Sequence, residues 1–372
     1  MTTIAVIGLG TMGLGIAQTY AGAGFDVLAT DAVAAARDTA LERLRAGLAP
    51  RVEAGKMAQA DLDALAARIT VVAGPQEMGA ADLAIEAVVE KPAVKAEIFA
   101  ALEAVVAPGA VLATNTSSLS VADMARDLAR PARLLGLHFF NPAPVMKLVE
   151  LVAHPGTDAV ALDKARRLTE AAGKTVIRCP DRPGFIVNRC ARPFYGEALA
   201  LLEEGRSAGD IDAAMLAAGY RLGPFGLIDL IGADINLAAT EGLAGAMDGH
   251  PRYHVFAALR RQVASGDLGR KTGKGFLYPD RPGPAPTDAA AIALRIEATL
   301  ANEAGWLLAE GGTTPEGIDT ALKLGLNFPR GPFQIIAAHG RPRLLAELRR
   351  LADAAPAPLQ SRYHPAPILE QP

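Results

Sequence analysis

The pattern of apolar and polar positions divides the chain into two halves. Up to about residue 178, short β-branched runs alternate with stretches of helical period, which is typical of a parallel sheet flanked by helices. Beyond the segment 180–184 (PDRPG) the apolar period becomes helical almost to the C-terminus. We therefore predict a mostly parallel α/β domain over residues 1–182, followed by an all-α region.

Short apolar runs in the first half are the expected strands, and most are followed by a helical stretch, as right-handed crossovers require. Residues 32–67 interrupt this alternation with a long Ala-, Leu- and Arg-rich stretch. We expect it to form a helical hairpin, broken near Pro50 and Gly55, that projects from the sheet. The expected strands cover residues 4–7, 25–29, 69–72, 83–87, 111–114, 134–137, 149–152 and 175–177.

The helical half contains an internal repeat. EALALLEEG at 197–205 matches EAGWLLAEG at 303–311, Ile211-Asp212 matches Ile318-Asp319, and GPF at 223–225 matches GPF at 331–333. The offset grows only from 106 to 108 residues, which favours a duplication over chance. The C-terminal region is therefore predicted to consist of two related helical units, 183–280 and 287–354.

Proline-rich segments bound the second unit. PDRPGPAP at 279–286 is expected to be a stiff linker, and residues 355–372 an extended tail. We expect residues 289–350 to pack on residues 185–280 as an internal pseudo-dimer. The chain is then either a monomer or a homodimer formed through another face.

A glycine motif follows the first expected strand. Gly8, Gly10 and Gly13, with Thr11 and Met12 between them, fit G-x-G-x-x-G at a strand-to-helix junction. This turn and the helix N-terminus can receive the pyrophosphate of a dinucleotide, so the first domain is predicted to be Rossmann-type. Asp31 ends the second strand, where a carboxylate accepts hydrogen bonds from the adenosine ribose. No arginine stands next to Asp31 in the sequence, which favours NAD over NADP; a glycine turn without a ligand is the alternative.

Composition excludes several classes of function. The 37 basic and 40 acidic residues give a formal charge of −3, without the basic excess of a nucleic-acid-binding protein. No apolar run is long enough for a membrane span, and the N-terminus does not resemble a signal peptide. We expect a cytoplasmic protein with no nucleic-acid or membrane partner. Its two cysteines, Cys179 and Cys190, are expected to be reduced.

Polar residues follow two further strands at their carboxyl ends, where open α/β sheets bind ligands. Asn115-Thr116-Ser117-Ser118 follows one strand, and His138 ends another, with Glu150 twelve residues later. An imidazole can take the proton of a secondary alcohol while its carbon gives up hydride, and a carboxylate can orient the imidazole. Glu150 can do so only if the chain turns back near Asn141. A buried structural histidine and a surface carboxylate are the alternative.

Four stretches, IGLGTMGLGIA, TNTSSL, LHFFNPAPVMKLVE and PGFIVNR, resemble the signatures of the L-3-hydroxyacyl-CoA dehydrogenases, in the same order. The resemblance covers roughly residues 1–280. It implies that His138 is the catalytic base and Glu150 its partner. It also implies that Ser117 and Asn188 contact the reacting end of the substrate, and that Asn141 lies beside the nicotinamide.

The resemblance extends to cofactor contacts. The stretch at 89–95 keeps Glu90 and Lys95 of the family pattern near the cofactor, but Lys91 and Pro92 depart from it. GRKTGKGFLY at 269–278 resembles the family's C-terminal loop, which implies that Lys271 reaches toward the cofactor.

Coenzyme A carries phosphates, so basic residues are required near the site. The hairpin offers Arg43, Arg45, Arg51 and Lys56, of which Arg51 and Lys56 are the expected substrate contacts; a solvated basic face is an equal alternative. No metal site is expected, because Pro251 separates His250 from His254 and no third ligand is evident.

These observations predict an NAD-dependent (S)-3-hydroxyacyl-CoA dehydrogenase that interconverts 3-hydroxyacyl-CoA and 3-ketoacyl-CoA in fatty acid, butanoate or aromatic-acid degradation. A related hydroxy-acid dehydrogenase of the gulonate or carnitine type is one alternative, and the basic hairpin argues against it. A catalytically silent NAD-binding protein is another. Joint retention of His138, Glu150, Ser117 and Asn188 argues against that reading.

Overall fold

The computed structural model describes residues 2–371 and divides into two compact units, Met1–Arg182 and Pro183–Pro372. Among the described residues, no helix combines the length and apolar character that a membrane span requires. Each unit is described separately below.

An eight-stranded sheet forms the centre of the first unit, in the order β3-β2-β1-β4-β5-β6-β7-β8. All neighbouring strands are parallel except β6 and β7, which are antiparallel. The predicted mostly parallel sheet is confirmed, and each expected strand is present. The strands are β1 (Thr3–Ile7), β2 (Asp26–Thr30), β3 (Ile69–Val71), β4 (Leu83–Glu86), β5 (Val111–Thr114), β6 (Leu134–Phe139), β7 (Leu148–Ala153) and β8 (Thr175–Pro180).

Helices cover this sheet. One apolar cluster joins the strands to α1, α3, α4 and α7, whereas Phe99 and Leu102 of α5 are fully buried elsewhere in the unit. The helices are α1 (Thr11–Gly22), α2 (Ala34–Asp38), α3 (Ala40–Glu53), α4 (Gln59–Ala67), α5 (Pro92–Val105), α6 (Val121–Ala125) and α7 (Ala159–Ala171), with 3-10 helices η1 (Pro75–Glu77) and η2 (Pro131–Arg133).

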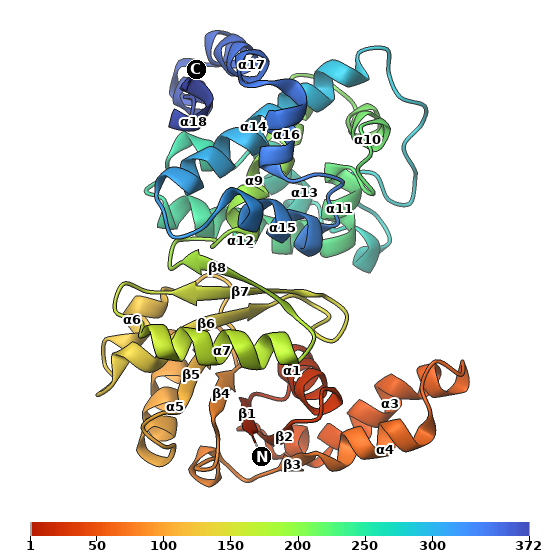
Figure 1. The fold of residues 1–372 in the computed structure, drawn as a ribbon. Helices are drawn as coiled ribbons and strands as arrows, with labels where there is room; N and C mark the ends of the chain where they lie inside the picture. The colour runs from red at the N-terminus through yellow and green to blue at the C-terminus, as the bar shows by residue number, and fades with distance from the viewer. Residues whose placement is uncertain (1, 372) are drawn as a thin grey trace. The chain divides into compact units, whose positions relative to one another are not determined.

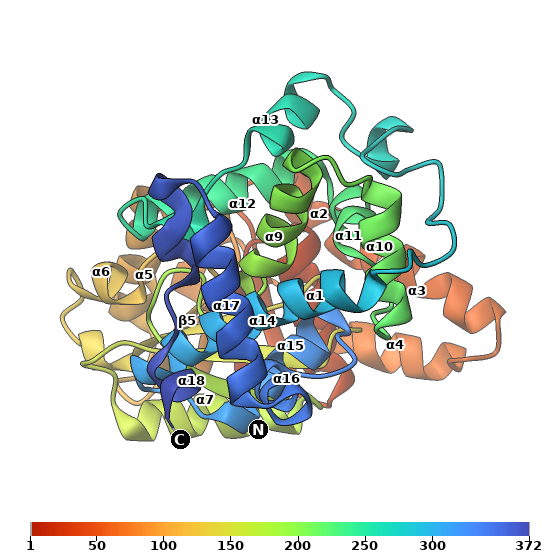
Figure 2. The same ribbon diagram turned by 90° about the horizontal axis from the view of Figure 1, so that it is seen from above.

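The predicted helical hairpin is formed by α3 and α4, which extend away from the rest of the first unit (Figures 1 and 2). Its break lies at Gly55, where φ is +67°, a value that glycine adopts without steric cost. The expected break at Pro50 was wrong, because α3 continues through Pro50 to Glu53.

The second unit is helical throughout. Its α-helices are α8 (Val187–Cys190), α9 (Arg192–Glu203), α10 (Ala208–Ala217), α11 (Pro224–Ile231), α12 (Ala233–Ala246), α13 (Ala257–Ala264), α14 (Ala289–Ala309), α15 (Pro315–Leu326), α16 (Pro332–His339), α17 (Arg341–Ala354) and α18 (Pro367–Glu370). The 3-10 helices are η3 (Pro251–Tyr253), η4 (Arg270–Thr272) and η5 (Ala357–Tyr363).

The two repeats share their local geometry. Asp212 accepts hydrogen bonds from the backbone N–H groups of Phe225 and Gly226 at 2.9 and 2.7 Å. Asp319 accepts from the matching groups of Phe333 and Gln334 at 2.7 and 3.1 Å. α14 of the second repeat packs on α9 and α10 of the first (Figure 2), so the predicted packing of one repeat on the other is observed.

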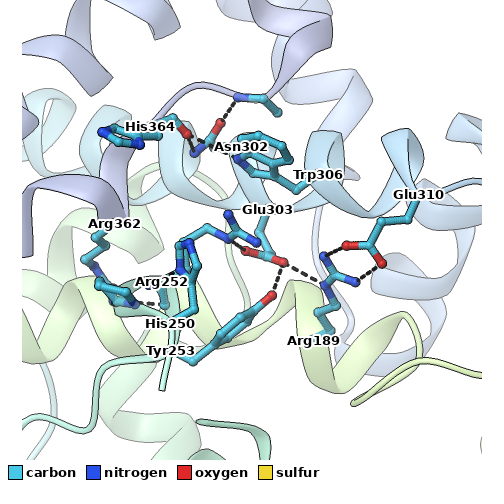
Figure 3. A network of polar contacts seen from close by, with 12 residues as sticks. Arg189, His250, Arg252, Tyr253, Asn302, Glu303, Trp306, Glu310, Arg362 and His364 are labelled. Atoms are coloured by element: carbon cyan, nitrogen blue, oxygen red, sulfur yellow. Dashed lines mark hydrogen bonds and ion pairs between the residues drawn. The ribbon is translucent and has the colours of Figure 1, made fainter. Parts of the chain in front are cut away.

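Two buried arginines join the repeats through ion pairs with approximate two-fold symmetry. Arg189 donates to Glu303 at 2.7 Å and to both oxygens of Glu310 at 2.7 and 2.8 Å (Figure 3). The equivalent Arg295 donates to Glu197 at 2.7 Å and to both oxygens of Glu204 at 2.6 and 2.7 Å. All three matched positions differ by 106 residues, so each repeat presents the same charges to the other.

The expected extended tail was wrong. Residues 357–363 form η5 and residues 367–370 form α18, with Arg362, Tyr363 and Leu369 buried. The Tyr363 hydroxyl donates to Glu197 at 3.0 Å, just as Tyr253 donates to Glu303 at 2.5 Å. The Arg-Tyr-His triplets at 252–254 and 362–364 therefore belong to the repeat, and its second unit continues beyond residue 354.

One pair of matched positions differs strongly in side-chain size, with Ala200 in the first repeat and Trp306 in the second. Trp306 donates from its indole N–H to the His364 carbonyl oxygen at 3.2 Å, and the Arg252 guanidinium lies 4.9 Å from its ring centre (Figure 3). The first repeat has Ala200 at that place, and a pocket of about 450 Å³ lies against Ala200, Glu204 and Phe256. The small side chain of Ala200 thus lines a pocket at the position that corresponds to the indole of Trp306 in the second repeat.

Candidate active site

Most of the expected site residues of the first unit lie at one edge of the sheet. The glycine motif, Asp31, Glu90, Ser117 and Asn141 follow β1, β2, β4, β5 and β6 respectively at their carboxyl ends, and His138 lies near the end of β6. β7 runs antiparallel to β6 and β8 runs parallel to β7, so the first residues of β7 and β8 also lie at this edge. The arrangement is the one in which open α/β sheets bind ligands.

The glycine motif forms the turn that a dinucleotide requires. Gly8 has φ of +98°, and a Cβ there would lie 2.5 Å from the Ala87 carbonyl oxygen. A Cβ at Gly13 would lie 1.8 Å from the Gly8 carbonyl oxygen, so only glycine permits this contact. Gly10 caps α1 without a side-chain hydrogen bond and faces open space. The N-terminus of α1 is therefore accessible to a phosphate.

Asp31 links the second strand to this turn. Its carboxylate accepts hydrogen bonds from the backbone N–H of Leu9 at 2.7 Å and of Val33 at 2.8 Å. The expectation that no arginine lies next to Asp31 was wrong, because two arginines approach this region in the folded chain. Arg37 donates to the Asp31 carbonyl oxygen at 2.6 Å, and Arg43 donates to the Leu9 carbonyl oxygen at 3.0 Å. An absence of arginine therefore gives no argument for NAD over NADP, and the Asp31 carboxylate is the remaining one.

A buried polar network lies behind β4 and β5. Lys95 is 1% exposed, and its ammonium donates to both oxygens of Glu86 at 2.7 and 2.8 Å and pairs with Glu90 at 3.0 Å. Glu90 also accepts from the Thr116 hydroxyl and from the Ser117 backbone N–H. Burial alone would raise the pKa of Glu90, but the Thr116 hydrogen bond and the Lys95 charge hold that pKa below its usual value.

This network brings together Glu90, Lys95 and Ser117, which the sequence analysis had named separately. It also contains Glu86, which the sequence analysis missed. A single acidic residue in an apolar strand was the available signal, since a carboxylate that is fully buried requires a partner.

His138 and Glu150 face each other across the antiparallel pair β6–β7. Directly opposed residues of such a pair project to the same side, so their side chains meet. The His138 Nδ1 lies 2.6 Å from the Glu150 Oε2, and the two residues are 7% and 0% exposed. The turn after Asn141 brings β7 back along β6, as the pairing of these residues requires.

Basic side chains line a pocket of about 570 Å³ between the hairpin and the starts of β7 and β8. Arg51 and Lys56 are among them, together with Lys147 and Lys174, which the sequence analysis missed. Each of these two lysines directly precedes a strand, and β7 and β8 are paired from their first residues. Burial lowers the pKa of Lys174, which donates to the carbonyl oxygens of Ala143 and Met146.

The other two arginines of the hairpin are engaged elsewhere. Arg45 forms an exposed ion pair with Asp63, and Arg43 bonds carbonyl oxygens of the glycine turn and of α2. Only Arg51 and Lys56 of the four hairpin residues line the pocket.

Two expected site residues belong to the helical unit. Asn188 lies in α8, is partly buried, and accepts a hydrogen bond from Arg192 through its carbonyl oxygen at 3.0 Å. Lys271 pairs with both oxygens of Asp234 at 2.5 and 2.6 Å, which lowers the pKa of Asp234. Among residues 2–371 no group of three or more His, Cys, Asp or Glu side chains could hold a metal ion.

Comparison with known proteins identifies the family. The sequence model of the 3-hydroxyacyl-CoA dehydrogenase NAD-binding domain matches residues 3–182, and that of the family's C-terminal domain matches twice, at 184–278 and 292–371. The chain belongs to the 3-hydroxyacyl-CoA dehydrogenase family. It is an NAD-dependent oxidoreductase of that family, and both the resemblance read from the four signature stretches and the duplication of the helical domain are confirmed.

Relatives in this family differ in how much of the chain they match. A probable 3-hydroxybutyryl-CoA dehydrogenase of Bacillus subtilis is 40% identical over 73% of this chain and 96% of its own length. A 3-hydroxyadipyl-CoA dehydrogenase of Escherichia coli K12 is 44% identical over 73% of this chain, which spans 58% of that protein. The solved 3-hydroxybutyryl-CoA dehydrogenase of E. coli K12 covers 99% of this chain and 97% of its own, at 32% identity and a TM-score of 0.89.

Proposed function

We propose that this dehydrogenase oxidises the 3-hydroxyl group of an (S)-3-hydroxyacyl-CoA, and reduces the corresponding 3-ketoacyl-CoA, with His138 as general base and Glu150 as its partner. The hydrogen bond of 2.6 Å between Nδ1 of His138 and the buried carboxylate of Glu150 carries this proposal. In this pairing Nε2 of His138 would take the hydroxyl proton, and the negative charge of Glu150 would stabilise the imidazolium that results. NAD, when bound, accepts the hydride from C3.

The geometry of the first unit supports the proposed cofactor contacts. The backbone of Gly8, Gly10, Thr11, Met12 and Gly13 would receive the pyrophosphate, and Asp31 would receive the ribose hydroxyls. Glu90 and Lys95 would lie near the nicotinamide half, because their network also fixes the Ser117 backbone. Asn141 and Lys271 complete the proposed cofactor set on the strength of the family motifs.

Substrate contacts are proposed at both ends of the acyl-CoA. Ser117 and Asn188 would hold the reacting end, and Arg51 and Lys56 the phosphates of coenzyme A. The basic lining of the pocket of about 570 Å³ supports the second assignment, since phosphate groups need charge-assisted partners. We place the reaction in acyl-CoA degradation, in the cytoplasm. We further infer a monomer, in which the packed repeats take the place of a subunit contact.

Absorbance of NADH tests the proposal with acetoacetyl-CoA, longer 3-ketoacyl-CoAs and free hydroxy acids as substrates. Only the thioesters should be turned over. His138→Ala should lower kcat by roughly 10² to 10⁴, as removal of a general base does, while NADH affinity measured by fluorescence stays nearly unchanged. His254→Ala, at an exposed position of the helical unit, is the matched control. Wild-type turnover in His138→Ala at every pH, or equal use of free hydroxy acids, would contradict the proposal.

A further inference from the structure

Arg192 is a buried charge at the start of α9. It is 8% exposed, and its Nε donates to the Asn188 carbonyl oxygen at 3.0 Å. Its Nη1 donates to the Thr240 hydroxyl at 3.1 Å, and the guanidinium carbon lies 4.9 Å from the centre of the Tyr195 ring. All three neighbours of the guanidinium are uncharged.

The other buried arginines have carboxylate partners. Arg133 pairs with Glu103, Arg189 with Glu303, Arg295 with Glu197 and Arg362 with Glu197. Among the described residues, no carboxylate contacts Arg192, and its Nη2 has no hydrogen-bond acceptor. Burial lowers the pKa of Arg192, and the nearby Tyr195 only partly offsets this effect. A buried charge is costly without a counter-ion, so an anion from outside the chain would stabilise this residue.

The position of Arg192 indicates which anion this is. Arg192 follows Asn188 by one helical turn and bonds its backbone, and Asn188 is the residue proposed to contact the reacting end of the acyl chain. An acyl group that ends in a second carboxylate brings an anion only a few bonds beyond C3; in a six-carbon chain that carboxylate lies three carbon–carbon bonds from C3. The planar guanidinium fork suits a carboxylate in particular.

We propose that Arg192 binds the terminal carboxylate of the acyl chain, so that the enzyme selects 3-hydroxyacyl-CoA thioesters of dicarboxylic acids over those of simple fatty acids. This proposal rests on the proposed function, because it concerns the same substrate site. Arg192 is then a specificity residue, and the general base acts on either class of substrate.

Wild-type protein provides the first test, through ligands that lack the 3-hydroxyl group and cannot react. Calorimetric titration should show adipyl-CoA binding at least tenfold more tightly than hexanoyl-CoA, which has the same number of acyl carbons. Likewise, kcat/KM should be higher for 3-hydroxyadipyl-CoA than for 3-hydroxyhexanoyl-CoA by on the order of 10². Equal affinities for the two ligands would overturn the proposal, whatever the variants show.

Variants provide the second test. Arg192→Met should lower kcat/KM for 3-hydroxyadipyl-CoA by about 10²-fold and change that for 3-hydroxyhexanoyl-CoA little. Arg192→Lys should restore part of the preference, because a lysine keeps the charge and loses the fork. Arg221→Met, the control, removes an exposed arginine of the same unit and should leave kcat/KM for both substrates unchanged.

If Arg192→Met lowers kcat/KM equally for both substrates, Arg192 has a structural role only and the proposal is overturned. If neither substrate is turned over by wild-type protein, the proposed function fails. The binding comparison would then still decide whether Arg192 recognises a carboxylate.

Discussion

Removing the chain after Tyr278 takes away the second repeat and the charged groups with which it pairs buried residues of the first repeat. Arg189, which is 0% exposed, would lose Glu303 and Glu310. Glu197, also 0% exposed, would lose Arg295 and Arg362. Apolar surface would be uncovered as well, because α14 packs along α9 in the intact chain.

The loss of stability in the fragment can be estimated from the burial of these charged groups. Breaking a buried ion pair by removing one partner costs about 3–5 kcal/mol, because the remaining charge stays in an apolar environment. Two such losses would cost roughly as much as the total stability of a typical domain, about 5–15 kcal/mol. The fragment 1–278 should therefore not persist as a folded monomer.

A second copy of the fragment can replace what was removed. The matched charged positions differ by 106 residues, so Glu197 and Glu204 of another copy can stand where Glu303 and Glu310 stood. We expect the fragment to dimerise or aggregate, and sedimentation across a concentration series will measure this against the intact chain. Arg189→Met in the fragment should weaken this dimer, because it removes the arginine that would pair with Glu197 and Glu204 of the other copy. A stable, fully active monomer of 1–278 would refute the reasoning.

Three further predictions concern single residues. Asp31→Ser should narrow the preference for NADH over NADPH in kcat/KM, since a partly buried carboxylate beside the 2′-phosphate costs on the order of 2 kcal/mol. Arg37 and Arg43 lie close enough to pair with that phosphate once the carboxylate is removed; an unchanged preference would exclude Asp31 as its cause. Glu150→Gln should lower kcat by roughly 10² to 10³, because the imidazolium that forms loses the charge of its partner; an unchanged kcat argues against the pair. Burial raises the pKa of Asp212 to about 6, so this group favours folding while protonated and lowers the free energy of unfolding as pH rises from about 4 to 6; thermal unfolding of Asp212→Asn across that range should lack this decline relative to wild type.

The first unit could be predicted well because its signals are local. Each strand is a short β-branched run beside a turn or helix, and the glycine motif requires the backbone geometry that Gly8 and Gly13 adopt. Pro50 was misread because α3 continues through it: the φ that proline fixes is close to the helical value, and its carbonyl oxygen still accepts from the Ala54 N–H at 3.1 Å.

The positions of the candidate site residues were predictable where they follow successive strands. They were less predictable where the pairing of distant strands decides which side chains become neighbours. Lys147 and Lys174 are 27 residues apart in sequence and become neighbours only through the pairing of β7 with β8. Arg37 and Arg43 approach Asp31 through the fold of α2 and α3, which sequence adjacency does not show.

The tail was mispredicted for a similar reason. Its prolines indicate an extended chain, but Tyr363 and Arg362 reach the buried Glu197 of the other repeat. The local propensity of each residue does not predict that contact. The matching Arg-Tyr-His triplets indicate it, because they show that the tail belongs to the repeat.

Covalent linkage of the repeats changes how this interface can evolve. In a symmetric homodimer every substitution at the interface occurs on both sides at once, so a large side chain must be accommodated twice. Here Trp306 and Ala200 occupy equivalent places, and only one half carries the indole. Each ion pair takes one residue from each half, so both halves must keep these charges, whereas other interface positions can change on one side only. The fused chain can thus acquire a one-sided hollow that a pair of identical subunits could not.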